Sequence, residues 1–192
     1  GVGQKLHEQL ARRLARSQME MGGKNPTIVL ADADLDLAVN LVVRAGFGLT
    51  GQACTATSRV IVERTVLPAF TEKLVAKAKS LKVGNGLTAG VDMGPVISEA
   101  QLNGNLAYVD GAVREGARLL CGGHRLTDGE LAHGWFMEAT VLGEVSPNMT
   151  IACEEVFGPV IAVIGVNDFE DALRVANGVE FGLSASIVTR DL

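Results

Sequence analysis

The pattern that most constrains the fold of this 192-residue chain is an alternation of short apolar runs with longer amphipathic stretches. Continuous apolar runs are typical of buried strands, and apolar residues spaced three and four apart indicate helices. The sequence predicts extended segments at residues 27–30, 59–63, 118–121, 136–145, 160–166 and 184–188. It predicts helices at residues 5–17, 35–49, 67–81, 98–115 and 168–177. This alternation favours an α/β domain with a mostly parallel sheet.

Polar residues mark several helix starts, and one connection is unusually long. Asp34 and Ser98 are predicted N-caps, and Asp168 is predicted to begin the last helix. The loop at residues 82–97 is rich in glycine. Loops of this length in a compact domain are usually functional or pack over a partner.

Charge and composition exclude several classes of protein. The net charge is -5 and no basic face is clustered, which argues against nucleic-acid binding. No apolar run approaches the ~20 residues that a membrane span needs. We expect no secretory leader, because residues 5–16 are amphipathic and charged with no apolar run behind them. The three cysteines, at positions 54, 121 and 153, lack metal-ligand spacing and suit reduced thiols. We therefore expect a cytoplasmic protein without a metal site.

Cys54 lies in a connection between a predicted helix and a predicted strand, a common place for catalytic groups. Gly51 gives this turn conformational freedom, and small neighbours leave space around the sulfur. One interpretation is a thiol presented to a substrate. The other is a buried cysteine that acts as a small hydrophobic residue, the more frequent role of free cysteines.

Two further stretches carry carboxylates beside glycine. Glu20 precedes Gly22 and Gly23, and a carboxylate held near a nucleophile or water can act as a general base. Glu154 and Glu155 precede an aromatic residue, and in extended backbone only one of two neighbours can face a given site. Each of these carboxylates is also compatible with an ordinary surface role. The three histidines, at positions 7, 124 and 133, lack the neighbours of a Cys–His dyad, which disfavours a cysteine hydrolase.

Three stretches in this order resemble the NAD(P)-dependent aldehyde dehydrogenase superfamily. They are MEMGGKNP at residues 19–26, GQACTATSR at residues 51–59 and EEVFGPV at residues 154–160. Supporting matches occur at residues 91–97, 134–141 and 181–185, so the likeness covers essentially the whole chain. The resemblance implies a three-layer α/β/α catalytic domain with a mostly parallel sheet.

The resemblance implies a role for each matching residue. Cys54 matches the nucleophile that forms a thiohemiacetal and then a thioester, and Glu20 matches the base that activates the hydrolytic water. Glu155 matches the group that hydrogen-bonds the nicotinamide ribose. Phe157 matches the neighbour that positions the ring. In the same way, Gly3 matches the second glycine of the cofactor turn, and Gly22 matches the floor between cofactor and thiol. The implied cofactor is NAD or NADP, and the implied partner is a small aldehyde.

Some features depart from the family pattern. Met21 replaces the usual leucine, and Cys153 stands where a polar residue is common, which we interpret as incidental. Family chains are longer at both ends, so we expect residues 1–18 to be a helix of the cofactor-binding domain and residues 19–192 to be a truncated catalytic domain. Such a fragment alone is expected to be inactive, and the full-length protein is expected to be a homodimer or homotetramer.

Two alternative functions remain open within this superfamily. An acylating enzyme would pass the acyl group to coenzyme A, but Glu20 argues against this branch because it typically lacks the base. A non-catalytic structural relative is disfavoured because both Cys54 and Glu20 are present. The run at residues 54–59, together with Asn25 and Pro26, most resembles enzymes for semialdehydes such as those of 2-oxoglutarate and succinate.

Overall fold

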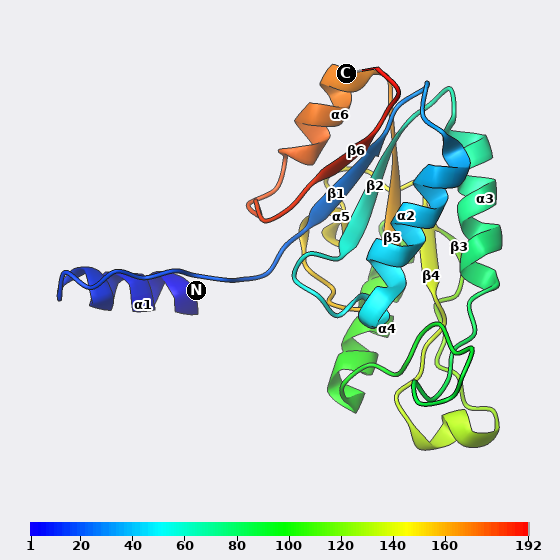
Figure 1. The fold of residues 1–192 in the computed structure, drawn as a ribbon, viewed down its shortest axis with the longest axis horizontal. Coiled ribbons are helices and arrows are strands. Elements are labelled where there is room, and N and C mark those ends of the chain that lie inside the picture. The colour runs from blue at the N-terminus through cyan, green and yellow to red at the C-terminus, as the bar shows by residue number, and fades with distance from the viewer. Residues whose placement is uncertain (192) are drawn as a thin grey trace.

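The structure, a computed structural model, describes residues 1–191 and contains one six-stranded sheet between two helical layers (Figure 1). The strands are β1 (Asn25–Val29), β2 (Thr57–Glu63), β3 (Arg118–Cys121), β4 (Thr140–Gly143), β5 (Val160–Val166) and β6 (Ser186–Val188). Their order across the sheet is β3-β4-β5-β2-β1-β6. All neighbouring pairs are parallel except β3 with β4. The expected three-layer α/β/α fold is therefore confirmed.

Alternation along the strands builds a core on each face of the sheet. In register, Ile28 of β1 lies beside Ile61 of β2, and Ile61 lies beside Ile164 of β5. These three residues pack against α4 (Glu99–Arg114), α5 (Thr150–Cys153) and α6 (Phe169–Ala176). The intervening valines, such as Val29 and Val62, face α2 (Leu35–Phe47) and α3 (Leu67–Lys79). Because successive side chains point to opposite faces, continuous apolar runs fill both layers.

Side-chain caps are present at three helix starts, at Asp34 and Ser98 as predicted and also at Asp168, which was predicted to begin its helix. The Asp34 carboxylate accepts hydrogen bonds from the first-turn amides of α2, the Ser98 hydroxyl accepts from α4, and the Asp168 carboxylate accepts from α6. Each cap satisfies backbone donors that have no partner within the helix. Helix starts were therefore predictable from single residues.

The ends of several elements differ from the sequence-based expectation. The first helix, α1 (Val2–Ala11), was expected to continue to residue 17. It stops because Leu14 adopts a left-handed conformation, with φ of 53°, and the amide of Ala15 donates back to the carbonyl of Leu10. This pattern is a Schellman C-cap. The extended segment expected at residues 136–145 forms a strand only over β4, and the short helix α5 was not predicted.

The N-terminal segment lies apart from the sheet. In Figure 1, α1 and the coil that follows it project away from the three layers, and α1 has no buried residues. The coil enters the domain at residues 22–25, where the chain becomes buried and β1 begins. No helix in the described part of the chain is long and apolar enough to cross a membrane.

Candidate active site

The thiol stretch, residues 51–56, connects a 3-10 helix, η1 (Gly48–Gly51), to the start of β2. Cys54 is exposed, so its sulfur is presented at the surface and is not part of the core. Gly51 has φ of 67°, and a Cβ at this position would lie 2.2 Å from the carbonyl oxygen of Gly158. Only glycine allows this combination of backbone conformation and close approach. The expectation that Gly51 shapes the turn is confirmed.

Asn25, at the start of β1, fixes the backbone of the thiol stretch. Its side chain is buried, and its Nδ2 donates to the carbonyls of Cys54 at 2.8 Å and Ala56 at 2.9 Å. Its Oδ1 accepts from the amide of Ser184 at 3.1 Å. Sequence reasoning quoted Asn25 within a motif but assigned it no positioning role. A buried amide that satisfies three backbone groups holds the thiol in a defined place.

The long loop at residues 82–97 is fastened to the same stretch. The Gln52 Oε1 accepts from the amide of Ile97 at 2.8 Å, and the Thr50 hydroxyl donates to the carbonyl of Gly94 at 3.2 Å. A cavity of about 550 Å³ lies between Gln52, this loop and residues 130–136. The loop therefore packs against the residues that present the thiol.

The acidic turn, residues 154–158, lies on another side of the thiol stretch. The Glu155 Oε1 accepts a hydrogen bond from the amide of Gly23 at 2.8 Å. A Cβ at Gly22 would lie 2.3 Å from Glu155 Oε2, and one at Gly23 would lie 2.5 Å from the carbonyl oxygen of Cys54. Glycine at both positions therefore lets the backbone fit between the carboxylate and the thiol stretch.

The two adjacent carboxylates point to different partners, as the sequence predicted. Glu154 accepts a hydrogen bond from the hydroxyl of Tyr108 at 2.8 Å, and this bond raises the pKa of Tyr108. Only Glu155 faces the glycines. Phe157 follows with φ of 57°, a strained conformation for a residue with a large side chain, and the residue is 37% exposed.

These groups fit the nicotinamide end of NAD(P). Glu155 has one oxygen held by Gly23, and carboxylate oxygens can accept hydrogen bonds from a ribose diol. Gly22 has no side chain to fill the space at the other oxygen, and the exposed Phe157 ring can flank a flat heterocycle. Gly3 is not part of this group. It lies inside α1, where a Cβ would lie 2.5 Å from the sulfur of Met21.

Glu20 lies outside this group of contacts. Its side chain is exposed, and its carboxylate accepts a hydrogen bond from Gln18 at 3.1 Å. Among the described residues, no direct hydrogen bond joins Glu20 to Cys54. Its role as general base therefore stays a prediction.

Two buried basic side chains lie behind the site. Arg59, at the start of β2, is 2% exposed and donates to the carbonyls of Lys24, Val175 and Ala176 at 2.9–3.0 Å. It thereby ties the end of α6 to the entrance of β1. Lys24 is also 2% exposed, and burial, together with the charge of Arg59, lowers its pKa from 10.5 to about 7. Cys153 donates to the carbonyl of Pro147 at 3.3 Å.

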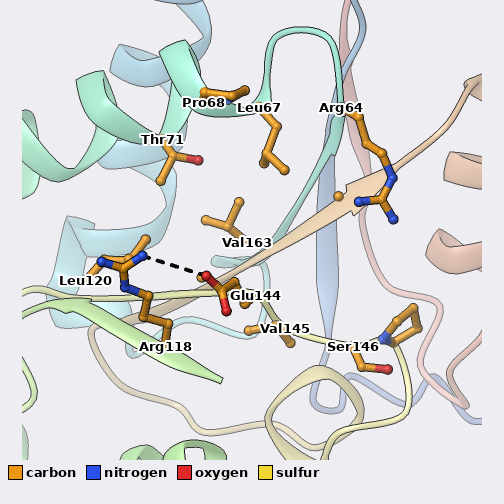
Figure 2. Close-up of a pocket in the computed structure, with 13 residues that line it drawn as sticks. Arg64, Leu67, Pro68, Thr71, Arg118, Leu120, Glu144, Val145, Ser146 and Val163 are labelled. Carbon is orange, nitrogen blue, oxygen red and sulfur yellow. Dashed lines mark ion pairs between the residues drawn. The ribbon is translucent and has the colours of Figure 1, made fainter. Parts of the chain in front are cut away.

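A cavity of about 750 Å³, whose lining Figure 2 shows, is remote from the thiol. It is lined from the far ends of β2 and β5, near Arg64 and Gly165, whereas Cys54 precedes the start of β2. Its charged side chains are already engaged, because Arg118 pairs with Glu144 at 3.7 Å and Arg64 donates to Asn167. None of the predicted site residues lines it. The candidate active site is therefore the contact between the thiol stretch and the acidic turn.

The fold and this contact define a class: an α/β/α domain that presents a thiol beside a glycine-cradled carboxylate. The sequence model described as "Aldehyde dehydrogenase family" matches residues 1–192. The chain belongs to the aldehyde dehydrogenase family.

Known proteins similar to the chain agree with this assignment. It is 46% identical to the alpha-ketoglutaric semialdehyde dehydrogenase of Bacillus subtilis (strain 168) and 50% identical to the alpha-ketoglutarate semialdehyde dehydrogenase of Haloferax volcanii. These matches cover 100% and 99% of this chain but 39% of each relative. A betaine aldehyde dehydrogenase from Staphylococcus aureus, solved in complex with NAD+, matches with a TM-score of 0.94 and 37% identity, over 99% of this chain and 38% of that structure. The chain thus spans about two fifths of the relatives' length.

Proposed function

We propose that the complete protein oxidises a small aldehyde to a carboxylate with NAD or NADP. The observation that carries the proposal is the contact network in which Gly22 and Gly23 lie between the Glu155 carboxylate and the backbone of Cys54. In this network Gly23 contacts both the Glu155 carboxylate, which is suited to a nicotinamide ribose, and the backbone of Cys54, the proposed nucleophile. Membership of the aldehyde dehydrogenase family supports the same reaction.

The proposed chemistry begins at the Cys54 sulfur. Its thiolate attacks the aldehyde carbon, a C–S bond forms, and the carbonyl oxygen becomes the oxyanion of a thiohemiacetal. The backbone amide of Cys54 is a candidate donor to that oxyanion. NAD(P), when bound, supplies the acceptor for the hydride that this carbon loses, which leaves a thioester on Cys54.

Hydrolysis of the thioester needs a base. In the proposal, Glu20 takes a proton from a water whose oxygen attacks the acyl carbon, the C–S bond breaks, and the carboxylate leaves. The exposed position of Glu20 in the coil after α1 leaves its carboxylate accessible to water. The acylating alternative would use coenzyme A in place of this water, and the structural alternative would make no use of the exposed thiol.

The proposed substrate is a semialdehyde, with 2-oxoglutarate semialdehyde first among the candidates. The names of the Bacillus and Haloferax relatives support this choice. We further propose a homodimer or homotetramer in the cytoplasm for the complete protein. Because Glu155, Phe157 and Gly22 reach only the nicotinamide end, we expect the 192-residue chain by itself to bind NAD(P) weakly and to turn over very slowly.

NAD(P)-coupled oxidation of an aldehyde panel by the complete protein tests the proposal. Cys54→Ala should abolish reduction of the cofactor, whereas Cys153→Ala, a matched cysteine control, should retain it. Glu20→Gln should still release one equivalent of reduced cofactor in a burst and then stall at the thioester. Recovery of steady turnover in Glu20→Gln by added coenzyme A would instead favour the acylating reaction. Full activity in Cys54→Ala would exclude the mechanism.

A further inference from the structure

The acidic turn contains a backbone conformation that its own residues do not favour. Phe157 has φ of 57°, in the left-handed region that residues with a Cβ rarely occupy. Such conformations persist where the surrounding structure enforces them, and they concentrate at functional sites. The residues that enforce this one come from α4, an element to which the sequence motifs assign no role.

Gln101 of α4 holds the two carbonyls around the strained residue. Its Nε2 donates to the carbonyl of Val156 at 2.9 Å and to that of Phe157 at 3.2 Å. Two donations to consecutive carbonyls fix the orientation of both peptide planes. The next turn of the same helix supplies the second constraint.

Asn105 is fully buried and lies directly under the acidic turn. Its Oδ1 accepts a hydrogen bond from Gln101 Nε2 at 2.7 Å, so it orients the amide that donates to the carbonyls of Val156 and Phe157. A Cβ at Gly158 would lie 2.1 Å from the Asn105 amide. Asn105 therefore determines how deeply the turn sits on α4.

The same turn contacts the thiol stretch on two sides. On one side, the carbonyl oxygen of Gly158 lies so close to Gly51 that a Cβ on Gly51 would be 2.2 Å from it. Gly51 begins the stretch that carries Cys54. On the other side, Glu155 binds the amide of Gly23, whose Cα packs on the carbonyl of Cys54. A displacement of the turn would therefore reach both the ribose-binding carboxylate and the thiol.

We propose that Asn105 is a positioning residue that locks the acidic turn against α4 and thereby sets the relative position of the cofactor-binding carboxylate and the nucleophilic thiol. It touches neither substrate nor cofactor and acts through Gly158 and Phe157. This inference rests on the proposed function. It adds a residue and a structural element, α4, to the machinery of the same site.

The test compares Asn105→Leu, which keeps the branched side-chain skeleton but removes the amide, with Asn103→Leu on the exposed side of the same helix. In the complete protein, Asn105→Leu should weaken NAD(P) binding about tenfold, as expected when buried polar groups lose their partners. It should also change the alkylation rate of Cys54 in the absence of cofactor. Asn103→Leu should leave both unchanged. Wild-type cofactor affinity and wild-type alkylation in a folded Asn105→Leu would overturn the proposal.

A double-mutant cycle with Phe157→Gly separates positioning from general destabilisation. Glycine adopts the left-handed conformation without strain, so the turn depends less on the contacts from α4 to keep this conformation. The loss of cofactor affinity caused by Asn105→Leu should therefore be smaller in the Phe157→Gly background than in the wild type. Equal losses in the two backgrounds would show a merely structural role and would contradict the inference.

Two controls keep the result interpretable. If Asn105→Leu does not fold, Gln101→Glu replaces the amide donor to the carbonyls of Val156 and Phe157 by a carboxylate oxygen. It should weaken cofactor binding in the same way, and unchanged binding would overturn the proposal. Failure of the proposed function is a separate outcome: it would appear as absent aldehyde oxidation in the wild-type protein. The cofactor-free alkylation of Cys54 reports on Asn105 in either case.

Discussion

The buried Lys24 makes the stability of the protein depend on pH in a direction opposite to that of a paired lysine. Burial, with the nearby charge of Arg59, lowers its pKa from 10.5 to about 7. Between these two values the unfolded chain binds a proton at Lys24 that the folded chain does not bind. The free energy of unfolding therefore rises with pH in this window.

Replacing Lys24 by methionine should remove this dependence. The difference in unfolding free energy between Lys24→Met and the wild type should be largest at and below pH 7. It should shrink by about 1.4 kcal/mol per pH unit as the pH approaches 10.5, a total of up to about 5 kcal/mol. Urea denaturation of both proteins at a series of pH values from 6 to 10.5 measures this difference in unfolding free energy. The contributions of the other titrating groups are the same in both proteins and cancel in the difference.

An exposed lysine provides the matched control. Lys73 pairs with Asp36, and the hydrogen bond to this carboxylate raises the pKa of Lys73. Both the folded and the unfolded chain keep its proton between pH 7 and about 10, so the stability difference for Lys73→Met should be flat in this range. An equally flat difference for Lys24→Met would refute the reasoning, because it would show that the folded protein keeps Lys24 protonated at no cost.

Two other substitutions test the thiol stretch. Gly51→Ala should lower the free energy of unfolding by at least about 2 kcal/mol, because Gly51 has φ of 67° and a Cβ would meet the carbonyl of Gly158. Gly48→Ala, where a Cβ meets nothing within 4 Å, should cost less than about 0.5 kcal/mol, and equal losses by urea denaturation would contradict this account. Asn25→Ala should cost about 2–3 kcal/mol and speed proteolysis near Cys54, because buried backbone carbonyls lose their donor. Unchanged stability and cleavage would show that Asn25 does not hold the stretch.

Much of the fold could be predicted because single residues and local patterns determine it. Continuous apolar runs located the central strands, and β5 was predicted at its observed bounds. The N-caps at Asp34 and Ser98 were predictable because a short polar side chain satisfies amides in its own helix. The end of α1 was not predictable, since it depends on Leu14 adopting a left-handed conformation that leucine rarely takes. The helix α5 is too short to show a period.

The candidate site was predictable where a motif names the residue and not where a distant contact defines it. Cys54, Glu155 and Phe157 were proposed as site residues from their motifs, and the structure brings the thiol stretch and the acidic turn together. The positioning role of Asn25 was missed because its partners lie 29 to 159 residues away along the chain. The burial of Asn105 was also missed, because a single asparagine in an amphipathic helix gives no sign that it is buried.

The parts of the proposed site differ in how firmly hydrogen bonds hold them in place. The thiol stretch and the acidic turn are held by buried groups from β1 and α4, whereas Glu20 lies in an exposed coil and has no hydrogen bond to the thiol. The proposed base therefore lies on a part of the chain separate from these held groups. The burst experiment with Glu20→Gln addresses it separately from the nucleophile.

The most direct test of the central claim is NAD(P)-coupled oxidation of 2-oxoglutarate semialdehyde by the complete protein and by its Cys54→Ala variant. The account predicts formation of reduced cofactor by the wild-type protein and none by the variant, with Cys153→Ala retaining activity. No reduction of either cofactor with this or any other aldehyde of the panel would contradict it, as would a Cys54→Ala variant that remains fully active.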